Sequence, residues 1–264
     1  DRFDSDVDPA SLRYRQFVTT DGSEVYLPAQ FAYFPYYGLG EPPIIENTTN
    51  GLAAHTSKKR AKLNGALELI ERESILRFWL NRIALPKLDP EGTELGRVQT
   101  ALAEQNLRLG LYRAKIVEEV ETVFAFIMAT DDSQPLLSFG ASAGVSLEDV
   151  ATEAVVECLH MRLWQRHFYD GKPAKPDRID GMFGRAQYWS SEPDDRKIAF
   201  VRENSTRTRL AAAQNSSTAD REAIETALVT GDLDLPEMYF ADVTVPYVAN
   251  EGIHVWRAFC PGFQ

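Results

Sequence analysis

Two stretches decide how this chain folds: the segment Thr48-Thr49-Asn50-Gly51-Leu52-Ala53-Ala54 and the helix-forming run that ends in Glu68-Leu69-Ile70-Glu71-Arg72. In the run, apolar residues recur at i, i+3, i+4 and i+7, a spacing that predicts a helix with one face in the core. The residues at these positions are Leu63, Ala66, Leu67 and Ile70. Ser57 is the expected N-cap, and the helix should extend from about residue 57 to about residue 81.

Two carboxylates and a guanidinium lie on one side of this predicted helix. Glu68 and Glu71 are three residues apart and Arg72 follows Glu68 by four, so the side chains project close together. On periodicity alone, the cluster is most typical of a solvated helix face that its own arginine stabilises. A cation between the carboxylates would instead turn their repulsion into attraction, and Mg²⁺ carrying nucleotide phosphates is one such cation.

A second acidic helix is predicted to begin near Ser146 and to continue to about Phe168. Glu153, Glu157 and His160 fall at i, i+4 and i+7 and form a polar stripe, which a solvent-facing surface explains as well as a site does. The apolar surface of this helix comes from Val150, Ala154, Cys158 and Met161. If the two helices face each other, their four carboxylates converge on one cleft, and such a cluster requires cations.

The remaining pattern predicts shorter elements and one long loop. Strands are expected at 14–18, 25–27, 111–117, 122–129, 238–243 and 254–259, and further helices at 92–106 and 218–230. The Gly-, Pro- and Asp-rich segment 170–194 predicts a mobile or substrate-facing loop. Because helices and strands alternate without a linker, we expect one α/β domain of mixed sheets packed with helices over residues 1–264.

Bulk properties exclude several classes of protein. The net charge of −11 argues against a nucleic acid or an anionic membrane as partner, because both require a basic surface. No apolar run approaches the roughly 18 residues of a membrane span, and the N-terminus does not resemble a signal peptide. Cys158 and Cys260 form no metal-binding or disulfide pattern, so we expect two buried thiols in a reducing, cytoplasmic compartment.

The order of these motifs resembles the YcaO family, ATP-dependent enzymes that activate backbone amides of peptides. The segment 50–54 and the Glu-x-x-Glu-Arg helix are similar to the family's nucleotide-binding helix, with Asn64 where many members have serine. The resemblance continues through further stretches, namely Ser146–Arg162, Tyr188-Trp189, Lys197–Val201, Asp242-Val243-Thr244 and Val255–Gly262. It covers the chain from about Gly22 to Gly262.

This resemblance implies a nucleotide cleft lined by the two acidic helices, with ATP and Mg²⁺ as cofactors. The implied metal ligands are Glu68, Glu71, Glu153 and Glu157. The residues implied to contact the nucleotide are these four together with Asn64, Arg72, His160 and Arg257. The two arginines would contact phosphate, since a planar guanidinium reaches phosphate oxygens bidentately. For Arg257, a side chain that covers a sheet edge is the alternative.

The implied reaction is the formation of thiazoline or oxazoline in a ribosomal precursor peptide by cyclodehydration. Thioamidation by the same ATP chemistry is one alternative, and a non-catalytic nucleotide-binding or scaffold subunit of a peptide-modifying complex is another. Besides the precursor peptide, the implied partners are a leader-peptide-binding protein, a flavin dehydrogenase and a second copy of the chain.

The two ends of the chain suggest a piece of a longer enzyme. The start at Asp1 is acidic and lacks a methionine, and residues 261–264 do not form the Pro-x-Pro-x-Pro tail of azoline-forming members. The chain alone is therefore expected to fold but not to turn over ATP at an enzyme-like rate.

Overall fold

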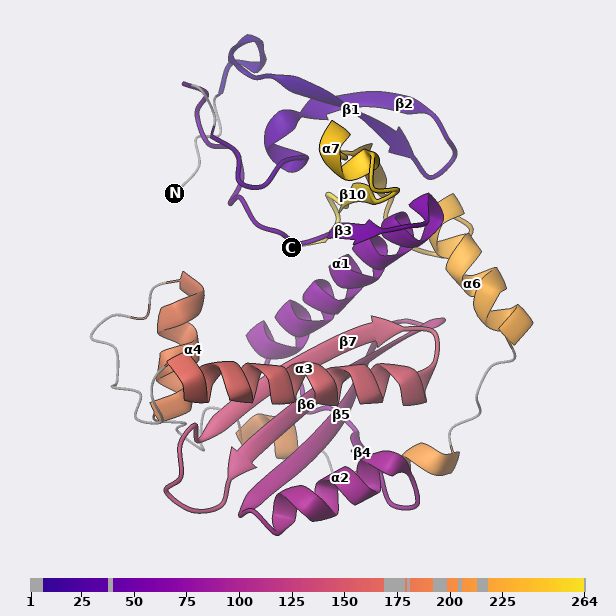
Figure 1. Ribbon diagram of the computed structural model, residues 1–264. Helices are drawn as coiled ribbons and strands as arrows, with labels where there is room; N and C mark the ends of the chain where they lie inside the picture. Colours follow the sequence, from indigo (N-terminus) through magenta and orange to yellow (C-terminus); the bar gives the residue numbers. More distant parts are fainter. Residues whose placement is uncertain are drawn as a thin grey trace. The chain divides into compact units, whose positions relative to one another are not determined.

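The computed structural model describes residues 7–37, 40–168, 179, 181–191, 199–203, 206–212 and 218–263 (Figure 1). The chain divides into two compact units: unit 1 is Asp1–Glu73 with Thr218–Gln264, and unit 2 is Ser74–Ser217. Each unit contains one five-stranded sheet within the described residues. The expected α/β class with mixed sheets and packed helices is confirmed, whereas a single domain over residues 1–264 stays a prediction.

The sheet of unit 1 has the strand order β2-β1-β9-β10-β3, and all neighbours are antiparallel. Its strands are β1 (Tyr14–Thr19), β2 (Glu24–Pro28), β3 (Leu52–His55), β9 (Tyr239–Asp242) and β10 (His254–Phe259). Four of these were predicted within a few residues. The short β3 was not predicted, because the Gly51-Leu52-Ala53 segment has low strand propensity. Its strand conformation depends on pairing with β10.

Helix α1 (Lys58–Leu80) begins and ends almost where the sequence predicts. Leu63, Ala66 and Ile70 are buried and Leu67 is half-buried, which confirms the apolar stripe. Near the start of α1, Arg60 Nη1 lies 2.8 Å from Glu225 Oε1. This ion pair joins α1 to α6 (Thr218–Thr230) within unit 1. Residues up to Glu73 belong to unit 1 and those from Ser74 to unit 2.

The sheet of unit 2 has the order β7-β6-β5-β4-β8, in which only the β4–β8 pair is parallel. Its strands are β4 (Lys87–Asp89), β5 (Leu107–Val117), β6 (Val120–Ala129), β7 (Leu137–Gly144) and β8 (Arg207–Arg209). Helices α2 (Glu94–Ala103) and α3 (Leu147–Phe168) lie on the same face of this sheet (Figure 1). Among the described residues, the remaining helices are α4 (Gly181–Ser191), α7 (Pro246–Ala249) and the 3₁₀ turns Pro9–Ser11, Ala29–Phe31, Ala199–Arg202 and Leu210–Ala212.

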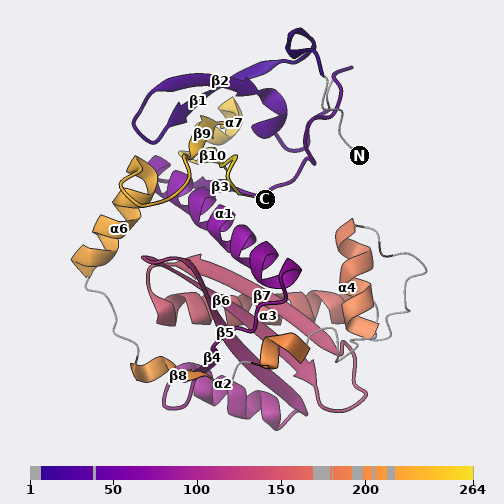
Figure 2. The same ribbon diagram turned by 180° about the vertical axis from the view of Figure 1, so that it is seen from behind.

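Strand β6 is apolar along most of its length because both faces of its sheet are covered. Val123, Ala125 and Ile127 pack in the cluster that α2 and α3 complete. The alternate residues Phe124 and Phe126 pack on the opposite face with Phe78 and Trp79 of α1. Figure 2 shows the last turns of α1 on that face of the sheet. The sheet is therefore the central layer of unit 2.

The prediction of one long loop over 170–194 is wrong for residues 181–191, which form α4. Tyr188 and Ser190 of this helix are buried, and the Ser190 carbonyl accepts a hydrogen bond from Leu136 N at 2.9 Å. Flanking glycines and prolines lowered the average helix propensity of the segment and concealed this short helix. The rest of 170–194, apart from Ile179, lies outside the described residues, as do residues 197 and 198.

Helix α3 packs directly on β7 at Gly140. A Cβ atom at this position would lie 2.3 Å from Cys158 N and 2.5 Å from Ala154 O. These are main-chain atoms of α3, which cannot move without displacing the helix. Glycine at position 140 therefore sets the distance between α3 and the sheet.

Gly140→Ala should lower the free energy of unfolding by about 3 kcal/mol, because the added methyl group overpacks the contact between helix and strand. Gly92→Ala is the control, since a methyl group at that position would have nothing within 4 Å and only the φ of +83° opposes alanine. That strain should cost about 1 kcal/mol. Chemical denaturation of the variants gives the comparison, and equal losses would contradict close packing at Gly140.

Candidate functional site

The three charged residues predicted to cluster on α1 do lie together. Arg72 Nε is 3.7 Å from Glu68 Oε1, and Arg72 Nη2 is 3.4 Å from Glu71 Oε1. Glu71 is buried, whereas Glu68 and Arg72 keep part of their side chains exposed. One guanidinium of α1 thus lies between two carboxylates of the same helix. Their role as ligands stays a prediction.

The second oxygen of Glu68 is held by the main chain. Gly51 donates its N–H to Glu68 Oε2 at 3.1 Å. Gly51 belongs to the turn before β3 and has a φ of +78°, a conformation that glycine adopts without strain. The Asn-Gly-Leu segment and the acidic helix, which are separate motifs in the sequence, therefore form one structural unit.

Arg257 does not cover a sheet edge. Strand β10 lies between β9 and β3, and Arg257 is buried within it. Its Nε donates to Phe31 O at 3.1 Å and its Nη1 donates to Thr48 O at 2.9 Å. Burial lowers the pKa of this guanidinium, and the nearby Glu68 carboxylate acts in the opposite direction. A phosphate contact by Arg257 stays a prediction, but two of its nitrogen atoms already hold the main chain.

Asn64 and the Asp-x-Thr motif are two further sequence features of unit 1. Asn64 is exposed on α1, one turn before Glu68, and its nucleotide contact stays a prediction. Asp242, at the end of β9, accepts a hydrogen bond from Thr244 N at 3.0 Å. Thr244 Oγ1 in turn accepts one from Val255 N at 2.9 Å. The Asp-x-Thr motif therefore closes the end of the strand pair β9–β10.

The acidic stripe of α3 is tied to β7. Glu153 Oε2 accepts from Ser142 Oγ at 2.8 Å, and Glu157 Oε2 accepts from Ala141 N at 2.7 Å. Glu153 and His160 are exposed and Glu157 is half-buried. The stripe is therefore more than a solvated surface, since two of its carboxylates fix α3 on the sheet. Because α1 carries Glu68 and Glu71 in unit 1 and α3 belongs to unit 2, their convergence on one cleft stays a prediction.

Sequence reasoning missed two buried polar residues on α3. Arg162 donates to Pro135 O at 2.6 Å, and burial lowers its pKa. Gln165 accepts from Ser138 Oγ at 2.7 Å. Both residues continue the buried stripe of Val150, Ala154 and Cys158 at helical spacing. A polar residue at a position where this spacing predicts an apolar one was the signal that could have revealed them.

Both cysteines are free and buried, as predicted. Burial raises the pKa of Cys158 to about 12, and it also raises the pKa of Cys260. Neither thiol is therefore ionised near neutral pH, and neither is a candidate nucleophile.

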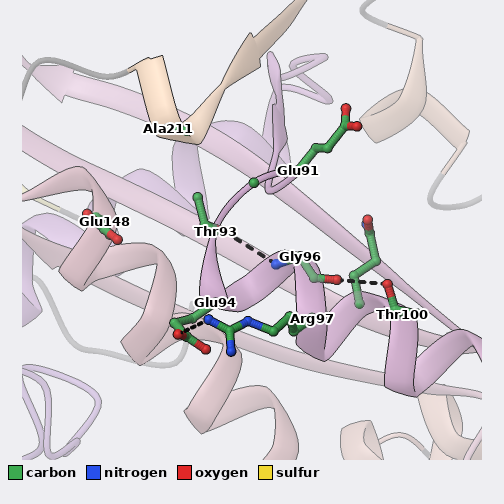
Figure 3. Close-up of a pocket in the computed structure, with 10 residues that line it drawn as sticks. Glu91, Thr93, Glu94, Gly96, Arg97, Thr100, Glu148 and Ala211 are labelled. Carbon is green, nitrogen blue, oxygen red and sulfur yellow. Dashed lines mark hydrogen bonds and ion pairs between the residues drawn. The ribbon is translucent and has the colours of Figure 1, made fainter.

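A hollow with a volume of about 730 Å³ lies in unit 2 (Figure 3). It is formed by the loop 91–93, the first turns of α2, Glu148 and Ala211. Thr93 caps α2 there, and Glu94 pairs with Arg97. None of the sequence-predicted site residues lines it, so it does not coincide with the chemistry that the motifs suggest.

The described part of the chain contains no group of three or more His, Cys, Asp or Glu side chains arranged around a metal position. Zinc or calcium would require such a cage. Mg²⁺ uses one or two protein carboxylates and completes its shell with water and substrate phosphates. The hard oxygen donors of Glu68 and Glu71 fit this second type of coordination.

A family model described as YcaO cyclodehydratase, ATP- and Mg²⁺-binding, matches residues 14–264. The match covers nearly the whole chain, so the protein belongs to the YcaO family. The cofactors of this family are ATP and Mg²⁺. The family resemblance carried by the two acidic helices and the C-terminal motifs is thereby confirmed.

Known proteins agree with this assignment. An uncharacterised protein of Methanothermobacter thermautotrophicus is 23% identical over 266 aligned positions, which include 93% of this chain and 63% of that protein. A YcaO structure from Methanopyrus kandleri bound with AMPPCP and Mg²⁺ has a TM-score of 0.74 at 22% identity, covering 95% of this chain and 64% of that chain. A heterocyclase in complex with substrate and cofactor has a TM-score of 0.77 at 20% identity, and the match covers 100% of this chain and 34% of that chain. The structures show that the fold is shared, and the chain spans less than two thirds of each of these proteins.

Within the described residues, no helix is both long and apolar enough to cross a membrane.

Arg257→Lys should lower the free energy of unfolding by about 1–3 kcal/mol, because the single nitrogen of lysine cannot reproduce the separate contacts that Nε and Nη1 make with two carbonyl groups. Arg97→Lys is the control, since the Arg97–Glu94 pair lies on the exposed surface of α2 and contributes little. Urea denaturation of the parent and both variants checks this. Equal stability of the parent and Arg257→Lys would show that the two carbonyl contacts contribute nothing.

Proposed function

We propose that this protein activates backbone amides of a ribosomal precursor peptide with ATP and Mg²⁺ and forms thiazoline or oxazoline rings by cyclodehydration. The observation that carries the proposal is the Glu68–Arg72–Glu71 cluster on α1, in a chain that the YcaO family model matches over residues 14–264. It places two Mg²⁺-compatible carboxylates next to a phosphate-compatible guanidinium.

The chemistry explains why ATP is required. A Cys, Ser or Thr side chain of the peptide adds to the preceding amide carbon and loses its proton. The former amide oxygen takes the γ-phosphoryl group of ATP, which releases ADP. This oxygen then leaves as phosphate while the amide nitrogen loses its proton and forms the C=N bond, so the peptide loses one water in total. An amide oxygen is a poor leaving group, and phosphorylation makes it a good one. Bound Mg²⁺ would supply charge neutralisation on the phosphates.

The residues of this chain would act by binding and positioning. Glu68 and Glu71 would hold the cation, and Arg72 would exchange part of its pairing with them for a phosphate oxygen. The other proposed nucleotide-contacting residues are Asn64, Glu153, Glu157, His160 and Arg257. In this proposal Glu153 and Glu157 line the same cleft as the α1 carboxylates and share the metal with them. The hydrogen bonds from β7 support this role, because they orient both side chains before any ligand binds.

The proposed setting is the cytoplasm, where two unpaired thiols stay reduced. A leader-peptide-binding protein, a flavin dehydrogenase and a second copy of the chain are proposed partners. Thioamidation would use the same activation with sulfide in place of the side-chain nucleophile. Mass spectrometry of the treated peptide distinguishes the two, because one product lacks a water and the other carries sulfur in place of oxygen.

Glu68→Gln and Glu71→Gln should each weaken Mg²⁺-dependent nucleotide binding by roughly tenfold or more, since each removes a negative charge from the cation's first shell. Glu94→Gln on the exposed face of α2 is the matched control and should bind like the parent. Calorimetric titration with a non-hydrolysable ATP analogue, with and without Mg²⁺, gives the comparison. Unchanged affinity in both α1 variants would refute the proposed site.

A further inference from the structure

The main chain of Gly51 passes very close to α1 at Gly65. A Cβ atom on Gly65 would lie 2.6 Å from Gly51 O, and one on Gly51 would lie 2.4 Å from Ala258 O. Both obstacles are main-chain atoms, and neither can yield as a flexible side chain would. At Gly65 only glycine fits without moving α1 away from the turn, and at Gly51 only glycine fits without moving the turn away from β10.

Both polar groups of Gly51 are used at this crossing. Its N–H is donated to Glu68 Oε2 at 3.1 Å, and its carbonyl accepts from Ala258 N of β10 at 2.7 Å. Gly65 and Glu68 are three residues apart on α1 and therefore lie on the same side of the helix. The place where α1 touches Gly51 is thus also where Gly51 binds the carboxylate.

The turn that carries Gly51 is fixed from the other side as well. Arg257 Nη1 binds Thr48 O at 2.9 Å, and within the turn Leu52 N donates to Thr49 O at 2.9 Å. The N–H of Gly51 therefore has one defined direction, set by β10 and by its own turn.

We propose that Gly51 and Gly65 are positioning residues for the metal-binding carboxylate of Glu68, an inference that rests on the proposed function. The Gly51 N–H fixes Oε2 and so turns Oε1 toward Arg72. Gly65 acts through Gly51, because its missing side chain lets the turn approach to hydrogen-bonding distance. Groups that orient a metal ligand in this way commonly change metal affinity when they are removed.

Gly65→Ala is the direct test. In most helices this change favours the helix, but here the methyl group should push the turn away and break the bond from Gly51 to Glu68. The Gly51 amide of the metal-free protein should then exchange its hydrogen faster, and the affinity for Mg²⁺ with a non-hydrolysable ATP analogue should fall by about tenfold. Gly252→Ala is the control, since Gly252 also lies in unit 1 with a positive φ of +70° but has nothing within 4 Å.

Two variants of Glu68 keep the test decisive if Gly65→Ala does not fold. Glu68→Ala removes the acceptor without adding bulk, so the Gly51 amide should lose protection. Glu68→Gln keeps an acceptor oxygen, so the amide should stay protected while Mg²⁺-dependent binding still falls. Amide exchange followed by NMR, together with calorimetry, separates the loss of orientation from the loss of charge.

The outcomes distinguish this inference from the proposed function. No Mg²⁺-dependent nucleotide binding by the unaltered chain would refute the proposed function, and amide exchange would then test the Gly51–Glu68 contact alone. Positioning is overturned if Gly65→Ala binds Mg²⁺ and nucleotide like the parent. It is also overturned if Glu68→Ala leaves the exchange of the Gly51 amide unchanged.

Discussion

A buried or half-buried charge needs a fixed partner, and in this protein the main chain often supplies it. Arg257 donates to two carbonyl oxygens, and Arg162 donates to one. Glu68 and Glu157 each accept a main-chain N–H. A partner in the main chain cannot rotate away as a side chain can, so these charges have defined directions before any ligand arrives.

Both units combine a close main-chain approach at a glycine with a carboxylate that accepts a main-chain N–H. Each acidic helix approaches neighbouring main chain closely at a glycine. A Cβ atom on Gly65 of α1 would lie 2.6 Å from Gly51 O, and one on Gly140 of β7 would lie 2.3 Å from Cys158 N of α3. At each crossing a glutamate of the helix accepts an N–H from the adjoining main chain, from Gly51 in one unit and from Ala141 in the other. Close approach and carboxylate orientation are therefore linked, since a larger separation would put the N–H out of reach.

The sequence predicted the long elements well because their periodicity is strong. The extents of α1 and α3 follow from apolar residues at helical spacing, and β6 follows from its dense β-branched and aromatic residues, whereas only the part of β5 from Leu111 onward was predicted. Strand β7, which contains Gly140 and Gly144, was missed because glycine weakens strand propensity. Its pairing with β6 along most of its length decides its conformation instead. Tertiary pairing of this kind leaves no trace in local composition.

The candidate site shows the same division between local and distant information. Spacing alone placed Glu68, Glu71 and Arg72 on one face of a helix, because residues three and four apart are neighbours there. It could not show that Gly51, seventeen residues earlier, binds one of these carboxylates, since that contact depends on how β3 pairs with β10. Nor could it show that Arg257, on β10, holds the turn from which Gly51 donates. The charged residues of the α1 cluster are local in sequence, whereas the groups that orient Glu68 come from β10 and the turn before β3. A change in that sheet would therefore change the geometry of the candidate site.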